Sequence, residues 1–189
     1  MKLLDLFCGM GGWSIGFHRA GFDCTGVDMT DWGYPYEFIQ RDIGNIREAL
    51  GKFDIVVASP PCQYYSQARN KLPRETEKGD VLVSEATRVI QLHEPRWWII
   101  ENVRGAVPHI NELLGQGPVY SRGPQFLWGH FPIPLINDQS FRKLGFFDKN
   151  TKTDRTREDY IKIRQSIRSI VPLGLSGPIA EACKEKIIT

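Results

Sequence analysis

Two residues with catalytic chemistry, Cys62 and Glu101, each follow a short apolar run. Cys62 comes after Pro60 and Pro61, whose rings fix the backbone and hold the thiol in a defined direction. A cysteine acts as a nucleophile only as the thiolate, so a positive charge or a helix terminus is expected nearby. Because a buried structural cysteine does not need such a rigid approach, we predict that Cys62 is a nucleophile.

Glu101 follows the apolar run at residues 97–100, where a carboxyl group is poorly solvated. Poor solvation favours the neutral form, and a carboxyl group that stays protonated near neutral pH suits a general acid. The alternative is a surface glutamate paired with Arg96 or Arg104. We favour the catalytic interpretation if Cys62 and Glu101 follow neighbouring strands, as their order suggests.

A glycine-rich turn, Gly9-Met10-Gly11-Gly12, follows the first apolar run. Glycines let the backbone approach a ligand closely, and the next helix offers unpaired N–H groups. Asp28 and Asp42 end the next two predicted strands, where nucleotide-binding folds place a carboxylate for ribose hydroxyls. Capping of a helix or turn is the alternative for both. The crowded glycines favour a nucleoside cofactor without a pyrophosphate, such as S-adenosylmethionine.

The elements that would position these residues alternate between apolar runs and amphipathic stretches. This alternation predicts a doubly wound α/β fold, with a mostly parallel sheet covered on both faces and its chemistry at the carboxyl ends of the strands. We expect strands at residues 3–7, 24–27, 38–40, 54–58 and 97–100, helices from the glycine turn to about residue 20 and over 81–92, and a helical turn or two at 46–50.

The pattern weakens after about Gly105, where we expect irregular structure or a minimal second lobe. A final helix is predicted from near Ser176 to about Lys186, with Pro178 in its first turn. The predicted division is a catalytic and cofactor-binding domain at 1–122, a minimal recognition region at 123–164, and a C-terminal segment at 165–189 that returns to the first domain.

The composition is that of an ordinary globular protein, with 41% hydrophobic residues, 24% charged residues and a net charge of +2. The apolar runs are too short to cross a bilayer, and Asp5 interrupts any signal-peptide core, so we expect a cytoplasmic protein with no membrane partner. The four cysteines form no CxxC or Cys/His cluster, so no metal is expected. Residues 142–168 are basic enough to track phosphates, although a solvated surface is the simpler interpretation.

Three motifs together resemble those of the cytosine-C5 DNA methyltransferases. They occur in the family's order and at similar spacing, and they are Asp5-Leu6-Phe7-Cys8-Gly9-Met10-Gly11-Gly12, Pro60-Pro61-Cys62-Gln63 with Ser66, and Glu101-Asn102-Val103. Residues 168–172 with 175–183 are similar to the family's last motif. The resemblance covers roughly residues 1–105 and 165–189, and its most specific part is the pair of motifs around Cys62 and Glu101.

The resemblance implies a Rossmann-like class I methyltransferase that methylates C5 of cytosine in double-stranded DNA, in restriction-modification or phage self-protection. Cys62 would add to C6 of a flipped cytosine, Glu101 would hold N3 and the exocyclic amine, and Arg122 is the candidate for a further contact to the base. The implied contacts to S-adenosylmethionine are Phe7, Gly9, Gly11, Gly12, Asp28, Asp42, Ile43, Pro60 and Ser169.

The chain departs from the family's pattern in its motifs and in its size. Ser59 replaces a frequent glycine and Tyr64-Tyr65 replaces Pro-Phe, and we expect neither to touch the reacting groups. Only about residues 131–163 are available for a target-recognition domain. Recognition is therefore rudimentary, supplied by a partner subunit, or provided by the loop at 64–79, which carries four basic residues.

Two other functions stay open. An RNA (tRNA) cytosine-C5 methyltransferase would carry the same motifs, and activity on duplex DNA against tRNA would separate the two. A non-catalytic DNA-binding subunit with the same fold would have no need of Cys62 and Glu101. An adenine amino-methyltransferase is disfavoured, since it would want Asp or Asn with an aromatic residue beside the prolines.

Overall fold

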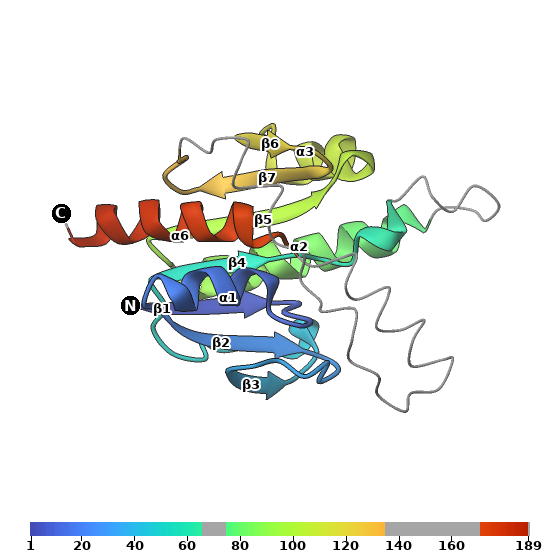
Figure 1. Ribbon diagram of the computed structural model, residues 1–189. Helices are drawn as coiled ribbons and strands as arrows, with labels where there is room; N and C mark the ends of the chain where they lie inside the picture. Colours follow the sequence, from blue (N-terminus) through green and yellow to red (C-terminus); the bar gives the residue numbers. More distant parts are fainter. Residues whose placement is uncertain (66–74, 135–170, 189) are drawn as a thin grey trace, which may run out of the picture.

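The computed structural model describes residues 1–65, 75–134 and 171–188, in which strands and helices largely alternate (Figure 1). The strands are β1 (Lys2–Leu6), β2 (Asp23–Asp28), β3 (Glu37–Gln40), β4 (Ile55–Ala58), β5 (Trp97–Val103), β6 (Tyr120–Arg122) and β7 (Gln125–His130). The helices are α1 (Gly12–Arg19), α2 (Thr76–His93), α3 (Val107–Leu114) and α6 (Leu173–Ile188), with short 3₁₀ turns η1 (Ile43–Asn45), η2 (Cys62–Tyr64) and η3 (Arg104–Ala106).

A seven-stranded sheet organises these elements in the order β3-β2-β1-β4-β5-β7-β6. Strands β1 to β5 are parallel, whereas β7 runs antiparallel to β5 and β6 runs antiparallel to β7. The chain starts at β1 in the middle, winds outward to β3, and then returns to β4 on the other side of β1. Ligands bind outside the carboxyl ends of the strands at such a reversal of strand order.

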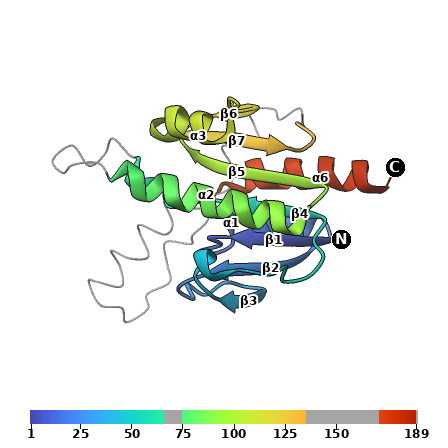
Figure 2. The same ribbon diagram turned by 180° about the vertical axis from the view of Figure 1, so that it is seen from behind.

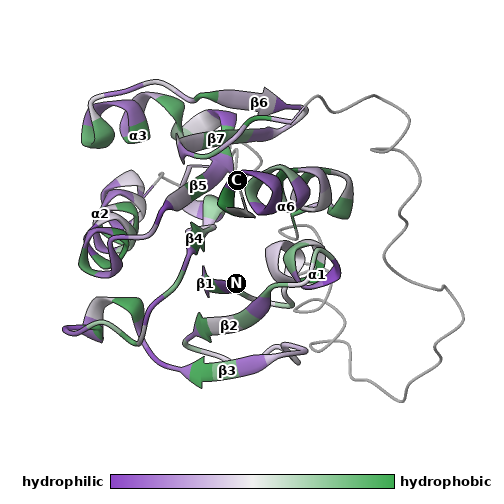
Figure 3. Ribbon diagram, turned by 90° about the vertical axis from the view of Figure 1, so that its left-hand side faces the viewer, coloured by the Kyte–Doolittle hydropathy of each residue, from purple (hydrophilic) through white to green (hydrophobic). Residues whose placement is uncertain are grey.

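Helices cover both faces of the sheet, with α1 and α6 on one side and α2 and α3 on the other (Figure 3). All four residues of β4 are buried, and alternate side chains serve opposite cores. Ile55 and Val57 pack in the core of α1 and α6, whereas Val56 and Ala58 pack in the core beneath α2, which Figure 2 shows in front of the sheet. A strand buried on both faces is therefore a continuous apolar run.

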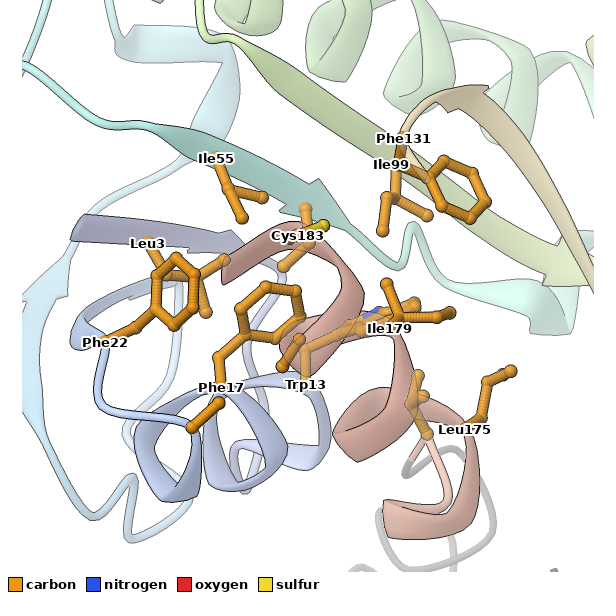
Figure 4. Packing of buried hydrophobic residues seen from close by; sticks show 14 of the residues in the cluster. Leu3, Trp13, Phe17, Phe22, Ile55, Ile99, Phe131, Leu175, Ile179 and Cys183 are labelled. Carbon is orange, nitrogen blue, oxygen red and sulfur yellow. The ribbon is translucent and has the colours of Figure 1, made fainter. Parts of the chain in front are cut away.

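The core between α1, α6 and the sheet fixes the helix that follows the glycine turn. Trp13 and Phe17 of α1 point toward Ile179 of α6 in the close view of Figure 4. The two helices touch at Gly16, because a side chain there would overlap Ser176. Burial contributes about 1.5–3 kcal/mol for each large apolar side chain, so this contact holds α1 firmly on the sheet.

The five predicted strands, the first helix and the doubly wound arrangement are confirmed. Helix α2 begins before the predicted start, because its first turn is polar and lacks the apolar periodicity of the rest. Strand β5 continues through Glu101 and Asn102 to Val103. It continues because β7 pairs with it along this stretch, so polar residues lie inside the strand and not after it.

Three predictions about secondary structure were wrong. Residues 46–50 form no helix, because side chains of α2 take their backbone groups: Arg88 donates to the Ile46 carbonyl, and His93 Nε2 accepts from the Leu50 N–H. Residues 105–134 are neither irregular nor a second lobe, since they form α3 and the strands β6 and β7 of the main sheet, and residues 135–170 lie outside the described residues. Helix α6 begins at Leu173, so Pro178 lies inside it and not in its first turn.

The proposed division of the chain stays a prediction. Residues 125–130 form β7 inside the sheet, and residues 135–164 lie outside the described residues. The C-terminal helix packs on α1, next to the start of the chain. Within the described residues, no helix combines the length and apolar character needed to span a membrane.

Candidate active site

The residues predicted to carry chemistry gather at the carboxyl ends of the parallel strands, beside the reversal between β1 and β4. They are the glycine turn after β1, Asp28 at the end of β2, Asp42 beyond β3, Cys62 beyond β4 and Glu101 within β5. One edge of the sheet therefore combines a turn suited to a cofactor with two side chains suited to catalysis.

The turn between β1 and α1 has an unusual backbone. Phe7, Gly9 and Gly11 have φ angles of 59°, 50° and 83°. The positive angle is strained for a bulky residue such as Phe7, and strain of this kind concentrates at ligand clamps. Gly11 caps α1 without a side chain, so no N-cap side chain occupies the first N–H groups of the helix.

Asp28 joins the end of β2 to the glycine turn. Its carboxylate oxygens accept hydrogen bonds from the backbone N–H groups of Gly9 at 3.1 Å and Thr30 at 3.2 Å. No helix begins at Asp28, so the helix-cap interpretation was wrong there. A carboxylate has about four acceptor positions, so these two hydrogen bonds do not exhaust its capacity.

Asp42 caps η1, as its alternative interpretation predicted, by accepting from the Gly44 N–H at 2.9 Å. The adjacent Ile43 side chain is only 2% exposed. Arg88 on α2 fixes this loop, because its guanidinium group donates to the carbonyls of Ile46 at 2.7 Å and Ile43 at 3.4 Å. Sequence reasoning missed Arg88, because its partners are backbone groups more than forty positions away.

Cys62 is half-buried at the first residue of η2. The buried Asn102 side chain of β5 fixes the backbone two residues before Cys62, because it donates a hydrogen bond to the Pro60 carbonyl at 3.0 Å. Burial and the nearby Glu101 carboxylate both raise the pKa of the Cys62 thiol, whereas the backbone N–H of Cys62 opposes them. The cysteine is therefore a thiol in the free protein at neutral pH, and its ionisation depends on the charge of Glu101.

Glu101 is only 9% exposed, and burial raises its pKa to about 7. The surface pairing was a wrong alternative, since the guanidinium groups of Arg96 and Arg104 lie over the rings of Trp97 and Phe126. A neutral carboxyl group is therefore accessible near neutral pH, as a general acid requires.

Ser59 touches Glu101, so the expectation that it would stay away from the reacting groups was wrong. Its side chain lies level with Glu101 on the neighbouring strand, and the interaction of its hydroxyl with the carboxylate lowers the pKa of Glu101. The same oxygen accepts from Trp13 Nε1 at 3.1 Å. Neither Trp13 nor Ser59 carries a local sequence signal for this contact.

Tyr65 anchors the chain immediately after η2. Its ring is fully buried, and its hydroxyl donates to Asp80 on α2 at 2.8 Å. Side chains at Gly79 or Gly105 would overlap Tyr65, so both glycines leave room for it. The segment that carries Cys62 is therefore fastened at both ends, by Asn102 before it and by Tyr65 after it.

The other predicted residues are less well connected to this site. Arg122 lies on β6 at the edge of the sheet, with β7 between it and β5, and its contact to the base stays a prediction. Ser66, Ser169 and the basic segment at 142–168 lie outside the described residues.

The other three cysteines differ from Cys62. Cys8, Cys24 and Cys183 are buried free thiols, and burial raises the pKa of each, to about 12 for Cys24 and Cys183. These three side chains pack as small buried apolar residues. Across the described part of the chain, no three His, Cys, Asp or Glu side chains form a group that would hold a metal ion.

Comparison with known proteins identifies relatives of this chain. The family model for the C-5 cytosine-specific DNA methylase matches residues 1–116. The Type II methyltransferase M.FnuDI of Fusobacterium nucleatum is 35% identical over 190 residues, which cover 96% of this chain and 52% of that protein. The Type II methylase M.HgiEI of Herpetosiphon aurantiacus is 29% identical over 185 residues, which cover 88% of this chain and 38% of that protein.

The chain thus spans about half, or less, of the length of these curated relatives. The matched family region contains the glycine turn, Cys62 and Glu101, and it covers more than half of the chain. On this evidence the chain belongs to the C-5 cytosine-specific DNA methylase family.

Proposed function

We propose that this chain transfers a methyl group from S-adenosylmethionine to C5 of cytosine in double-stranded DNA. The observation that carries the proposal is the pairing of Cys62 with Glu101: the half-buried thiol follows β4, the buried carboxyl group lies on the neighbouring strand β5, and the charge of Glu101 raises the pKa of Cys62. Family membership supports the same reaction, as do relatives named Type II methyltransferases.

The turn beside this pair fits S-adenosylmethionine. The N-terminus of α1, which no N-cap side chain occupies, suits a carboxylate, and Asp28 has acceptor positions left for a ribose. The loop capped by Asp42 lies at the adjacent strand end, where adenine would meet Asp42 and Ile43. When bound, this cofactor supplies an electrophilic methyl group. Phe7 and Pro60 would line the same site, and Ser169 is proposed as a further contact.

The chemistry at cytosine follows from the two side chains. Cys62 Sγ forms a bond to C6, and the electrons of the C5–C6 double bond make C5 nucleophilic. Neutral Glu101 donates to N3 and stabilises the charge that develops on the ring. After C5 has gained the methyl group, loss of its proton to a base restores the double bond and expels the Cys62 thiolate. The cytosine must leave the base stack to reach this pair.

The ionisation of Cys62 depends on the charge of Glu101. An ionised Glu101 raises the pKa of Cys62, so protonation of Glu101 makes the Cys62 thiolate easier to form. The reactive combination is therefore a thiolate beside a neutral carboxyl group. Both conditions are met together only if Glu101 keeps its pKa near neutrality, as its burial provides.

Target recognition is a separate part of the proposal. We propose that Arg122 contacts the base and that residues 123–164, or a partner subunit, read the DNA sequence. Because the chain spans about half the length of M.FnuDI, the isolated chain and a complex with a partner are both worth assaying.

The proposal is tested with methyl-labelled S-adenosylmethionine and mixed-sequence duplex DNA, with tRNA in parallel. Digestion to nucleosides and mass spectrometry identify the labelled base. Labelled 5-methylcytosine from DNA is expected with the wild-type chain and not with Cys62→Ser. Label found only in tRNA would replace DNA by RNA as the substrate, and labelled N6-methyladenine would contradict the reaction class.

A further inference from the structure

The side chains of Trp13 in α1, Ser59 after β4 and Glu101 in β5 lie together on the face of the sheet that α1 covers. Ala58 of β4 pairs with Ile100 of β5, so the next residues, Ser59 and Glu101, lie level with each other. Successive residues of a strand point to opposite faces. Because Ala58 and Ile100 face the core of α2, Ser59 and Glu101 face the side of α1, where Trp13 lies.

The directions of the hydrogen bonds are set by the donors. An indole N–H can only donate, so Ser59 Oγ must accept from Trp13 Nε1, at 3.1 Å. The single hydroxyl proton of Ser59 is then free to point at the Glu101 carboxylate, which lies level with it on the same face of the sheet. Trp13 is itself 2% exposed and locked in the core, so it fixes where Ser59 points.

We infer that Ser59, oriented by the Trp13 indole, is a positioning residue that holds the Glu101 carboxyl group in one orientation for the target base. This inference rests on the proposed function, because it gives Glu101 a base to meet. It adds two residues that the sequence motifs did not include, and one of them replaces a glycine that is frequent in the family.

The charge of Glu101 gives the arrangement a measurable signature. Burial raises the pKa of Glu101 to about 7, and the Ser59 hydrogen bond acts in the opposite direction. Ser59→Ala removes a donor to the charged form, so we expect the pKa of Glu101 to rise by about one unit. Ser59→Thr keeps a hydroxyl and is the matched control.

The first experiment measures this pKa in the free chain. Protein labelled with ¹³C at the glutamate carboxyl carbon is titrated by NMR as wild type, Ser59→Ala and Ser59→Thr, with Glu101→Gln to assign the signal. We expect a higher pKa in the alanine variant, a return toward wild type with threonine, and a shifted Trp13 indole N–H resonance in the alanine variant alone. An unchanged pKa and an unchanged indole signal would overturn the inference.

The second experiment measures methyl transfer against pH. Ser59→Ala should lower kcat by about tenfold, leave the KM for S-adenosylmethionine unchanged, and move the alkaline limb upward by about one pH unit, because neutral Glu101 persists to higher pH. Trp13→Phe should produce a smaller change of the same kind. A wild-type rate and pH profile in Ser59→Ala would overturn the inference. If the wild-type chain methylates nothing, the proposed function fails, while the NMR titration still decides whether Ser59 acts on Glu101.

Discussion

Two buried carboxyl groups in this protein have matching surroundings, and only one belongs to the proposed active site. In β1, Asp5 accepts a hydrogen bond from the Ser14 hydroxyl at 2.6 Å, and Ser14 accepts from the Tyr34 hydroxyl at 2.6 Å. In β5, Glu101 lies level with Ser59, which accepts from a tryptophan and lowers the pKa of Glu101. Burial raises the pKa of Asp5 and of Glu101 to about 7.

The difference lies in what each carboxyl group faces. Asp5 is 1% exposed, and its partner Tyr34 is buried as well, so the group ties α1 and the loop after β2 to β1. Glu101 lies near the carboxyl edge of the sheet beside Cys62, whose pKa responds to its charge. A raised pKa alone therefore does not mark a catalytic acid, and the neighbouring nucleophile distinguishes the two groups.

The largest expected effect comes from removing that nucleophile. Cys62→Ser should lower methyl transfer by more than about 10³-fold, because the first bond to C6 is lost. Initial rates with labelled cofactor measure it. Cys183→Ala is the matched control, since Cys183 lies in the core beneath α6, and it should keep its rate within a few fold. Equal losses in both variants would contradict a special role for Cys62.

The next effect separates the two carboxyl groups. Glu101→Gln keeps the shape of the side chain but cannot supply an acidic proton, and single-turnover rates should fall by about 10²–10⁴-fold. Asp5→Asn should reduce the rate far less, because Asp5 meets no reacting group. Comparable rates for these two variants would break the distinction between a structural and a catalytic carboxyl group.

The stability of the protein should depend on pH through Asp5. Its pKa is raised from 3.8 to about 7, so its contribution to stability is fully present below pH 3.8 and is lost as pH rises through about 7. The loss amounts to about 4 kcal/mol by linkage. Urea unfolding between pH 4 and 7.5 should therefore show a flatter pH dependence in Asp5→Asn than in the wild type. If the free energy of unfolding depends on pH in the same way in both proteins, Asp5 does not titrate with a raised pKa.

The smallest effect is expected at Tyr34, which donates to Ser14 in the series of hydrogen bonds that ends at Asp5. Tyr34→Phe removes the hydrogen bond to Ser14 and should lower the free energy of unfolding by about 1 kcal/mol, with methyl transfer within about twofold of wild type. Thermal unfolding and initial rates measure the two quantities. A shift in the pH–rate profile of Tyr34→Phe would show that the two chains of hydrogen bonds are not independent.

Local patterns in the sequence were enough to predict the framework of the fold and where its chemistry lies. Strand β4 is a run of four buried apolar residues, and the prolines before Cys62 mark its end. Glu101 follows an apolar run that pairs with β4. The prediction that Cys62 and Glu101 follow neighbouring strands is therefore confirmed.

The contacts that act across the sheet could not be predicted. The bond from Trp13 to Ser59 depends on the register of β4 and β5 and on the placement of α1, which no local pattern encodes. Strand β7 was missed in part because of Gly129, a typical loop residue. A side chain there would overlap the Trp98 backbone, so the glycine permits close pairing with β5.

The most direct test of the Cys62 and Glu101 assignment is to trap the covalent intermediate. A duplex that carries 5-fluorocytosine cannot lose a proton from C5, so a cysteine bonded to C6 stays attached after the methyl group has been transferred. Digestion of the complex and peptide mass spectrometry should locate the base on Cys62 in the wild-type chain, with no adduct in Cys62→Ser. An adduct on another residue, or labelled 5-methylcytosine formed with unsubstituted DNA while the fluorinated duplex is never trapped, would contradict the assignment.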